Sequence, residues 1–148
     1  MIIKRISNII SACLIAAYVA FLAIRWSSFP DELPTHFNAA GVADSYGSKA
    51  SLLIEPIVML GLFILLAVVE CFPGIWNIPV HVTKANEAEV MGICYMLFGV
   101  LKISVILICA FSGFMCVFAG FPVWPTYLMI GVILVSLILS IVRLARYN

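Results

Sequence analysis

Residues 52–71 read LLIEPIVMLGLFILLAVVEC, a run in which the only charged side chains are Glu55 and Glu70. An α-helix rises about 1.5 Å per residue, so about twenty apolar residues span the roughly 30 Å hydrocarbon core of a bilayer. Three further apolar stretches occupy residues 6–24, 92–118 and 127–142. The sequence therefore predicts four membrane-spanning helices.

The bulk composition favours the same interpretation. Of 148 residues, 65% are hydrophobic and 10% are charged, and a water-soluble domain of this length cannot bury so much apolar surface. The net charge of +1 gives no indication of a nucleic-acid partner. The spanning stretches are uniformly apolar rather than alternating, which excludes membrane strands. We therefore predict one all-α domain over residues 1–148, an integral membrane four-helix bundle with up-down-up-down topology and a long outer loop between helices 1 and 2.

The distribution of basic residues predicts the orientation of this bundle. If the N-terminus is cytoplasmic, the inner side carries Lys4, Arg5, Lys84, Arg143 and Arg146, and the outer side carries Arg25 and Lys49. Basic residues collect on the cytoplasmic side of membrane proteins. Both termini are therefore expected in the cytoplasm, and the first apolar stretch is expected to remain as an uncleaved helix, since no small-residue cleavage site follows it.

The first connection, residues 26–50, is the longest polar stretch of the chain. Its prolines and glycines are typical of turns rather than of regular elements. Its polar residues Asp31, Glu32, His36, Asn38 and Asp44 match no metal-ligand spacing. We expect a turn-rich loop that satisfies its own hydrogen bonds and holds no metal.

The connection before the third helix carries two further predictions. The alternation in residues 77–83 indicates a short extended segment. Asn86 followed by Glu89 has the form of a helix N-cap with its capping partner, although Thr83 offers a rival start one turn earlier. A helix from Asn86 to about Phe118 is about 50 Å long, so its first turns should project beyond the membrane.

Lys102 is the most informative residue, because an ionisable group inside a spanning segment costs about 2.5–3.5 kcal/mol on insertion scales. It is expected about one turn inside the inner boundary of its helix, at a depth comparable to that of Glu70. Two interpretations remain open: a snorkelling lysine or structural ion pair with Glu70, and a functional intramembrane site. Glu55, followed by Pro56, is expected to mark a helix start in the outer interface.

The residues that commonly carry catalysis are sparse. The motifs of nucleophilic hydrolases and of zinc proteases are missing from the sequence, and His36 and His81 are predicted on opposite sides of the bilayer. We therefore predict a protein that is not an enzyme and needs no cofactor. The cysteines are expected to be small buried hydrophobic residues without a disulfide framework; they are Cys13, Cys71, Cys94, Cys109 and Cys116.

The first connection closely resembles the signature of a bacterial membrane domain of unknown function. The pattern is PTHFN-x-x-G-x-x-D-x-x-GSK, and its residues are Pro34, His36, Asn38, Gly41, Asp44, Gly47 and Lys49. A second stretch, Asn77-Ile-Pro79 and Thr83-x-x-Asn86 before a helix with Lys102, resembles small stand-alone members of the same group. The same domain forms the N-terminal part of the SdpI-type immunity proteins, whose further C-terminal membrane domain this sequence lacks. The resemblance implies a bacterial inner-membrane protein and, by analogy, protection against a secreted peptide toxin.

These observations lead to one main functional expectation and two alternatives. The outer loop is expected to bind a peptide toxin or another ligand through the seven motif residues, so that His36→Ala or Asn38→Ala should abolish protection. The first alternative is a small transporter or transporter subunit in which Lys102 and Glu70 line a polar path. The second is an assembly subunit that binds a membrane partner through the small-residue face from Gly113 to Gly120.

Overall fold

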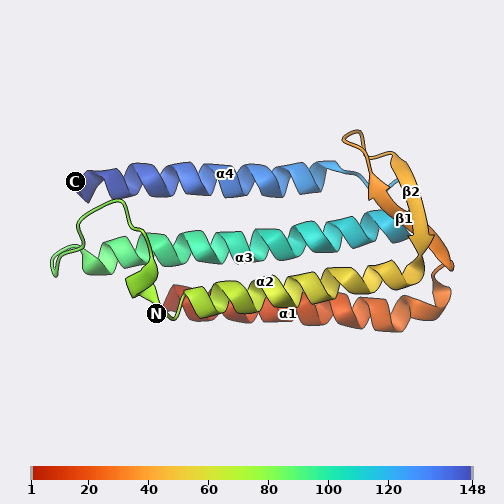
Figure 1. Ribbon diagram of the computed structural model, residues 1–148, viewed down its shortest axis with the longest axis horizontal. Helices are drawn as coiled ribbons and strands as arrows, with labels where there is room; N and C mark the ends of the chain where they lie inside the picture. Colours follow the sequence, from red (N-terminus) through yellow and green to blue (C-terminus); the bar gives the residue numbers. More distant parts are fainter. Residues whose placement is uncertain (1, 148) are drawn as a thin grey trace.

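The computed structural model describes residues 2–147 and contains four long helices joined antiparallel (Figure 1). All four are long and apolar enough to cross a membrane, which confirms the predicted multi-pass helical architecture. Their bounds are α1 Ile2–Arg25, α2 Ile54–Val69, α3 Glu87–Val117 and α4 Trp124–Leu144. A short 3-10 helix, Lys49–Leu53, runs directly into α2, so the helical segment at this position begins earlier than the apolar run suggested.

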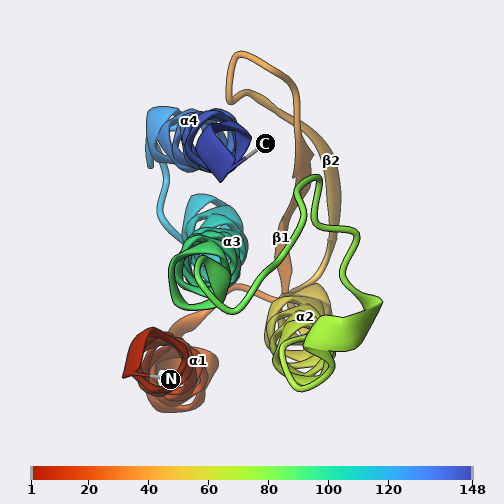
Figure 2. The ribbon, with the colours of Figure 1, turned by 90° about the vertical axis from the view of Figure 1, so that its left-hand side faces the viewer.

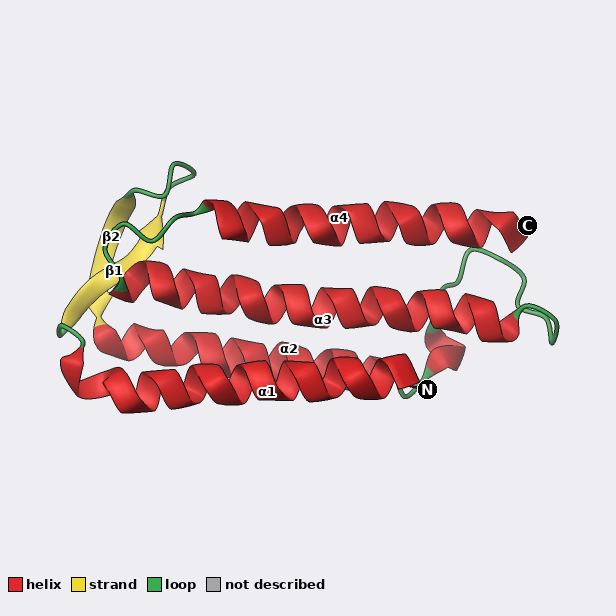
Figure 3. Ribbon diagram, turned by 180° about the vertical axis from the view of Figure 1, so that it is seen from behind, coloured by secondary structure: helices red, strands yellow, loops and turns green. Residues whose placement is uncertain are grey.

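Helix α3 lies at the centre of the bundle and packs against α1, α2 and α4. Viewed along the helix axes, α1 and α2 lie on one side of α3 and α4 lies on the other (Figure 2). One end of the bundle carries the connection between α1 and α2, and we call it the hairpin end. The other carries both chain termini and residues 70–86, and we call it the terminal end (Figure 3).

The connection at the hairpin end contains regular structure, which corrects the prediction of turns alone. Strand β1, Glu32–Phe37, pairs antiparallel with β2, Ala43–Ser48, in a two-stranded sheet. The register shifts around His36, so the ladder is irregular. A two-stranded hairpin is marginal alone, and this one is held by the bundle, since Leu33 is buried in the main core.

The contact between α1 and α3 is built on small residues. The buried stripe of α1 consists of Ser7, Ser11, Ile15, Tyr18 and Leu22, at spacings of three and four residues. It faces an α3 surface that includes Gly99, Ala110 and Gly113. Glycine allows close approach here, because a Cβ at Gly99 would lie 3.1 Å from that of Ser7, and one at Gly113 would collide with the Tyr18 hydroxyl. Such packing replaces the hydrophobic effect as the force between helices in lipid.

The start of α3 departs from the predicted cap. Asn86 occupies the N-cap position, but its side chain makes no cap hydrogen bond. Instead, its Oδ1 accepts a hydrogen bond from the Thr83 backbone N–H at 2.7 Å. The Glu89 carboxylate accepts a hydrogen bond from the Tyr147 hydroxyl, so it is not a capping partner. Residues 77–83 form no strand.

Two other predictions are wrong. The proposed face from Gly113 to Gly120 does not exist, because α3 ends at Val117 and Gly120 lies in the following turn with φ +76°. The cysteines are free thiols, but Cys13 and Cys71 are exposed on the protein surface and the other three are only half-buried. In a membrane the apolar lipid satisfies such side chains, so burial inside the bundle is not required.

Candidate functional site

The tip of the hairpin is shaped by Asn38 and Gly41. The Asn38 side-chain oxygen accepts hydrogen bonds from the backbone N–H groups of Ala40 and Val42, at 2.9 and 3.1 Å. Gly41 adopts φ +78°, in the left-handed region that residues with a Cβ rarely occupy. These two motif residues therefore fold the turn, and the oxygen of Asn38 is engaged within it.

Further motif residues fasten the strands to each other. His36 Nδ1 and Asp44 Oδ1 lie 2.5 Å apart across the sheet. At Gly47, an added Cβ would meet Thr35 Cγ2 of the opposite strand at 3.1 Å, so the glycine lets the two strands pack closely at this position. The His36 side chain is 69% exposed, and its free ring edge is available to a ligand.

The base of the hairpin is closed by Lys49 and Asp31. The Lys49 ammonium lies 2.8 Å from the Asp31 carboxylate, and its backbone N–H donates to the Asp31 carbonyl at 2.9 Å. The hydrogen bond from Lys49, followed by its charge, holds the pKa of Asp31 below the usual value. The same ammonium lies 5.9 Å from the centre of the Trp26 ring. Lys49 therefore ties β2 to the end of α1.

Beneath the hairpin lies a cavity of about 320 Å³ between β1, α3 and α4. Its walls combine apolar and hydroxyl-bearing side chains from the three elements. The lining includes Thr35, His36, Ile108, Ser112, Met115, Thr126 and Tyr127. The Tyr127 hydroxyl donates to the Ala39 carbonyl at 2.5 Å and so joins α4 to the hairpin. The cavity can take an amphipathic ligand.

The hairpin end carries a negative formal charge. Between residues 25 and 55 the acidic side chains are Asp31, Glu32, Asp44 and Glu55, and the basic ones are Arg25 and Lys49, which gives −2. The terminal end carries a positive formal charge. Apart from Glu70 and Lys102, which pair inside the bundle, its acidic residues are Glu87 and Glu89. Its basic residues are Lys4, Arg5, Lys84, Arg143 and Arg146. The exposed Asp31, Glu32 and Asp44 thus outnumber the two basic residues around the hairpin, which favours a cationic ligand there.

The second group of polar residues lies inside the bundle near the terminal end. Lys102 Nζ donates to Glu70 Oε2 at 2.8 Å, and both side chains are fully buried. The Asn8 side-chain oxygen accepts a second hydrogen bond from Lys102. The structure thus brings Lys102 and Glu70 together, and Lys102 points into the bundle instead of snorkelling to its surface.

This buried pair has hydrogen-bonding capacity that the described residues leave unused. Glu70 Oε1 and Ser11 Oγ are buried, and neither has a partner within residues 2–147. Lys102 has three N–H groups and two acceptors. Lys4 donates to the Glu70 backbone carbonyl at 3.2 Å and adds another positive charge nearby.

The sequence did not single out Asn8. The available signal was its place in the first apolar stretch, one position after Ser7 and three before Ser11, where polar residues recur at helical spacing. A single amide side chain within one or two turns of a helix end gives no further signal, because it can reach the polar surface of the membrane. Only the position of α3 shows that it faces Lys102.

Glu55 lies in the first turn of α2, as predicted, but its side chain is less exposed than expected for a residue at a helix start. The helical segment begins at Lys49, so Glu55 comes nearly two turns later, and its Oε2 is buried without a partner among the described residues. The Tyr18 hydroxyl is buried and unpartnered in the same way. Glu55 is therefore not exposed to the surrounding water as a simple helix-start residue would be.

The predicted site residues form two separate sets. The hairpin end gathers the seven motif residues, and the terminal end gathers Glu70 and Lys102 with Asn8. His36 and His81 lie at opposite ends, since His81 belongs to the 70–86 connection. Within residues 2–147, no group of three histidine, cysteine, aspartate or glutamate side chains is close enough to hold a metal ion.

Comparison with known proteins adds a match that falls on the hairpin end. Residues 13–60, which include most of α1, the whole hairpin and the start of α2, match the family model of a domain of unknown function, DUF1648. No curated protein and no solved structure gives a significant match. The chain is a multi-pass membrane protein by its helices, and over residues 13–60 it is similar to a domain of unknown function, DUF1648.

Proposed function

We propose that the chain is a non-enzymatic bacterial inner-membrane protein that binds a cationic, membrane-active peptide at its hairpin end. The observation that supports this most directly is the cavity of about 320 Å³ between β1, α3 and α4. It opens at a membrane end, and its walls offer both apolar surface and hydroxyl groups. An amphipathic peptide presents the same combination of surfaces.

The charge and the family resemblance support a peptide as the ligand. The formal charge of −2 at the hairpin end attracts a cationic partner and repels an anionic one. The resemblance of the hairpin motif to the N-terminal part of SdpI-type immunity proteins favours a peptide toxin. In this proposal the hairpin faces the outside of the cell and both termini are cytoplasmic, as the basic residues favour.

Blocking the cavity tests the binding site. Thr126→Trp places a bulky ring in the cavity wall, whereas Leu128→Trp places the same ring on the exposed side of α4 at the same end. Cells that produce the Thr126→Trp protein should lose protection against a cationic membrane-active peptide. Cells with the Leu128→Trp protein should keep it at equal membrane levels. Equal protection by both variants would contradict the proposal.

The orientation has its own test. A cysteine introduced at the exposed Ser45 should react with a membrane-impermeant maleimide in intact cells. The native Cys71, exposed at the terminal end, should react only after permeabilisation. Labelling in the reverse order would place the hairpin in the cytoplasm and exclude binding of an external peptide there.

A transporter is the second candidate, and the buried pair favours it. Glu70 Oε1 and Ser11 Oγ have no partner among the described residues, whereas a purely structural pair is expected to satisfy all its polar groups. Ionisable residues inside membranes often mark ion or substrate paths. Flux into proteoliposomes distinguishes the candidates, since transport that survives Lys102→Met would make the pair structural.

A further inference from the structure

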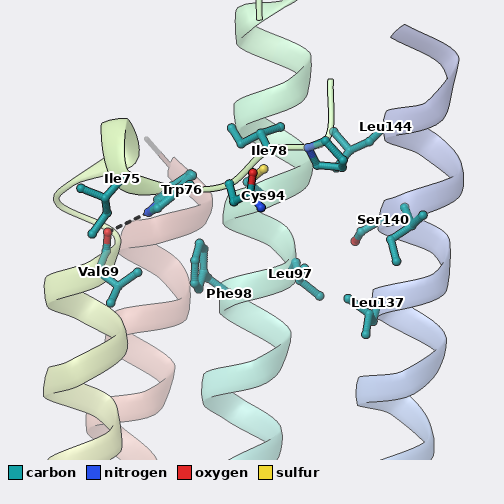
Figure 4. Close-up of a pocket in the computed structure, with 13 residues that line it drawn as sticks. Val69, Ile75, Trp76, Ile78, Cys94, Leu97, Phe98, Leu137, Ser140 and Leu144 are labelled. Carbon is teal, nitrogen blue, oxygen red and sulfur yellow. Dashed lines mark hydrogen bonds between the residues drawn. The ribbon is translucent and has the colours of Figure 1, made fainter. Parts of the chain in front are cut away.

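A second cavity lies at the terminal end, away from the hairpin. It has a volume of about 510 Å³ and is lined mainly by residues 75–79, α3 and α4 (Figure 4). Its lining is almost entirely apolar and includes Ile78, Leu97, Leu137 and Leu144. Ile78 and Leu144 lie toward the terminal end, and Leu97 and Leu137 lie deeper between the two helices.

One wall of this cavity is fixed in place by Trp76. Its indole N–H donates to the Val69 carbonyl at 2.9 Å. Its ring also packs against Phe98 and Tyr95, with centroid distances of 5.0 and 5.3 Å. These contacts hold the connection away from α4, so the space between them is built into the fold and does not close by movement of a free loop.

The position of the cavity restricts what can fill it. Leu97, Phe98 and Leu137 belong to helices that are apolar enough to span the membrane, so the surrounding medium is hydrocarbon. The connection between α2 and α3, whose residues 75–79 line the cavity, passes over one side of the bundle end (Figure 2). A further spanning helix, about 10 Å across with its side chains, would meet this connection, whereas a flexible acyl chain can bend past Ile78 and Leu144.

The charges at this end favour an anionic headgroup. Arg143 precedes Leu144, and its side chain lines a smaller hollow that shares Leu97 and Ser140 with the cavity. Within residues 2–147, Arg143 and Lys84 take part in no salt bridge. Basic groups at the membrane surface attract anionic lipids, and arginine binds phosphate well.

We propose that this cavity holds one acyl chain of an anionic phospholipid from the leaflet at the terminal end, with the lipid phosphate at Arg143. The chain fills the apolar space between residues 75–79, α3 and α4. The lipid then contacts both α4 and the connection and so joins these two parts of the protein. This site is separate from the peptide site and does not depend on it.

Matched substitutions on α4 test the acyl-chain site. Leu137→Trp fills the cavity, whereas Leu134→Trp adds the same ring to an exposed position one turn away that does not line it. Native mass spectrometry of detergent-purified protein with added phosphatidylglycerol should show one fewer retained lipid for Leu137→Trp than for Leu134→Trp. Equal retention by the two variants would overturn the proposal.

A charge variant tests the headgroup without changing the cavity. Arg143→Gln should lose the preference of the wild-type protein for phosphatidylglycerol over phosphatidylcholine, whereas Arg25→Gln at the other end should keep it. If wild type shows no such preference, the anionic headgroup is excluded. If Leu137→Trp changes the oligomer mass but not the lipid count, the cavity belongs to a second copy of the chain and the lipid proposal fails.

Discussion

The ammonium group of Lys102 and the carboxylate of Glu70 lie 2.8 Å apart, and neither side chain has any exposed surface. The two residues come from different helical segments, 32 positions apart in the sequence. Each charge is compensated by the other, so the pair is tolerated in the bundle as a unit. Removal of one member leaves the other buried and uncompensated.

This relationship predicts strongly non-additive effects on stability. Lys102→Met should destabilise the protein by about 3–5 kcal/mol, since it leaves the Glu70 carboxylate unpaired. The double variant Lys102→Met/Glu70→Gln should recover most of that loss. The free energy of unfolding of the single and the double variant can be measured in mixed micelles. Lys49→Met, which breaks the surface pair of Lys49 with the exposed Asp31, should cost about 0–1 kcal/mol and serves as the control. Equal losses in the single and double variants would refute the coupling.

The close approach of α1 to α3 predicts that Gly113 tolerates no side chain. Gly113→Ala should destabilise the bundle by about 1–3 kcal/mol, because its Cβ would collide with the Tyr18 hydroxyl. Gly131→Ala on α4, where a Cβ meets nothing within 4 Å, should have little effect. Thermal unfolding in detergent compares the two. Tyr18→Phe should restore part of the stability of Gly113→Ala, and a lack of any rescue would place the clash elsewhere.

Gly41 and Gly120 have the same backbone conformation but different surroundings. Substitutions at the two positions therefore separate the cost of backbone strain from the cost of a side-chain contact. Gly41 and Gly120 have φ values of +78° and +76°, so an alanine at either position should cost about 1–2 kcal/mol in backbone strain. At Gly41 the new Cβ also lies 3.1 Å from Val123 Cβ, whereas at Gly120 it meets open space. Gly41→Ala should therefore be the more destabilising in thermal unfolding. The reverse order would show that the hairpin tip does not rest on Val123.

The ion pair between Asp31 and Lys49 predicts that the stability of the hairpin depends on pH in the acid range. The hydrogen bond that Lys49 donates to the Asp31 carboxylate keeps the pKa of Asp31 lower in the folded protein than in the unfolded chain. The stabilisation is therefore present above about pH 4, the usual range of an aspartate, and is lost as the pH falls through the lower folded value. The effect is small, because the Asp31 side chain is 96% exposed. The protection of the hairpin amides, measured relative to the intrinsic exchange rate at each pH, should fall in this range, and Asp31→Asn should remove that change.

The helices were predictable because their signal is local. A run of about twenty apolar residues fixes a spanning helix almost regardless of its neighbours. The depth of Lys102 and Glu70 within two such runs also indicated that the two could meet. The N-cap position of Asn86 was also predictable, but its capping hydrogen bond was not, because the side chain of an asparagine at a helix start can instead accept from the preceding turn, and here it accepts from Thr83.

The hairpin was not predictable in the same way, because its stability comes from residues far apart in the chain. Pro34 and Gly47 are typical of turns, yet both lie within strands. The strands form because Lys49 binds Asp31, Leu33 enters the bundle core and Tyr127 binds Ala39. None of these contacts leaves a periodic pattern in residues 26–50. The cavity under β1 depends on the same contacts, so its lining from α3 and α4 was equally hidden.

The two tyrosines at the ends of α4 have a consequence for the bilayer itself. Tyr127 binds the hairpin through Ala39 and Tyr147 binds Glu89 at the other end. Twenty residues of helix separate them, about 30 Å at 1.5 Å each, which equals the usual thickness of the hydrocarbon layer. A thicker or thinner membrane must deform around α4 or change its tilt, and a tilt of α4 relative to the hairpin or to α3 would strain these two phenol contacts.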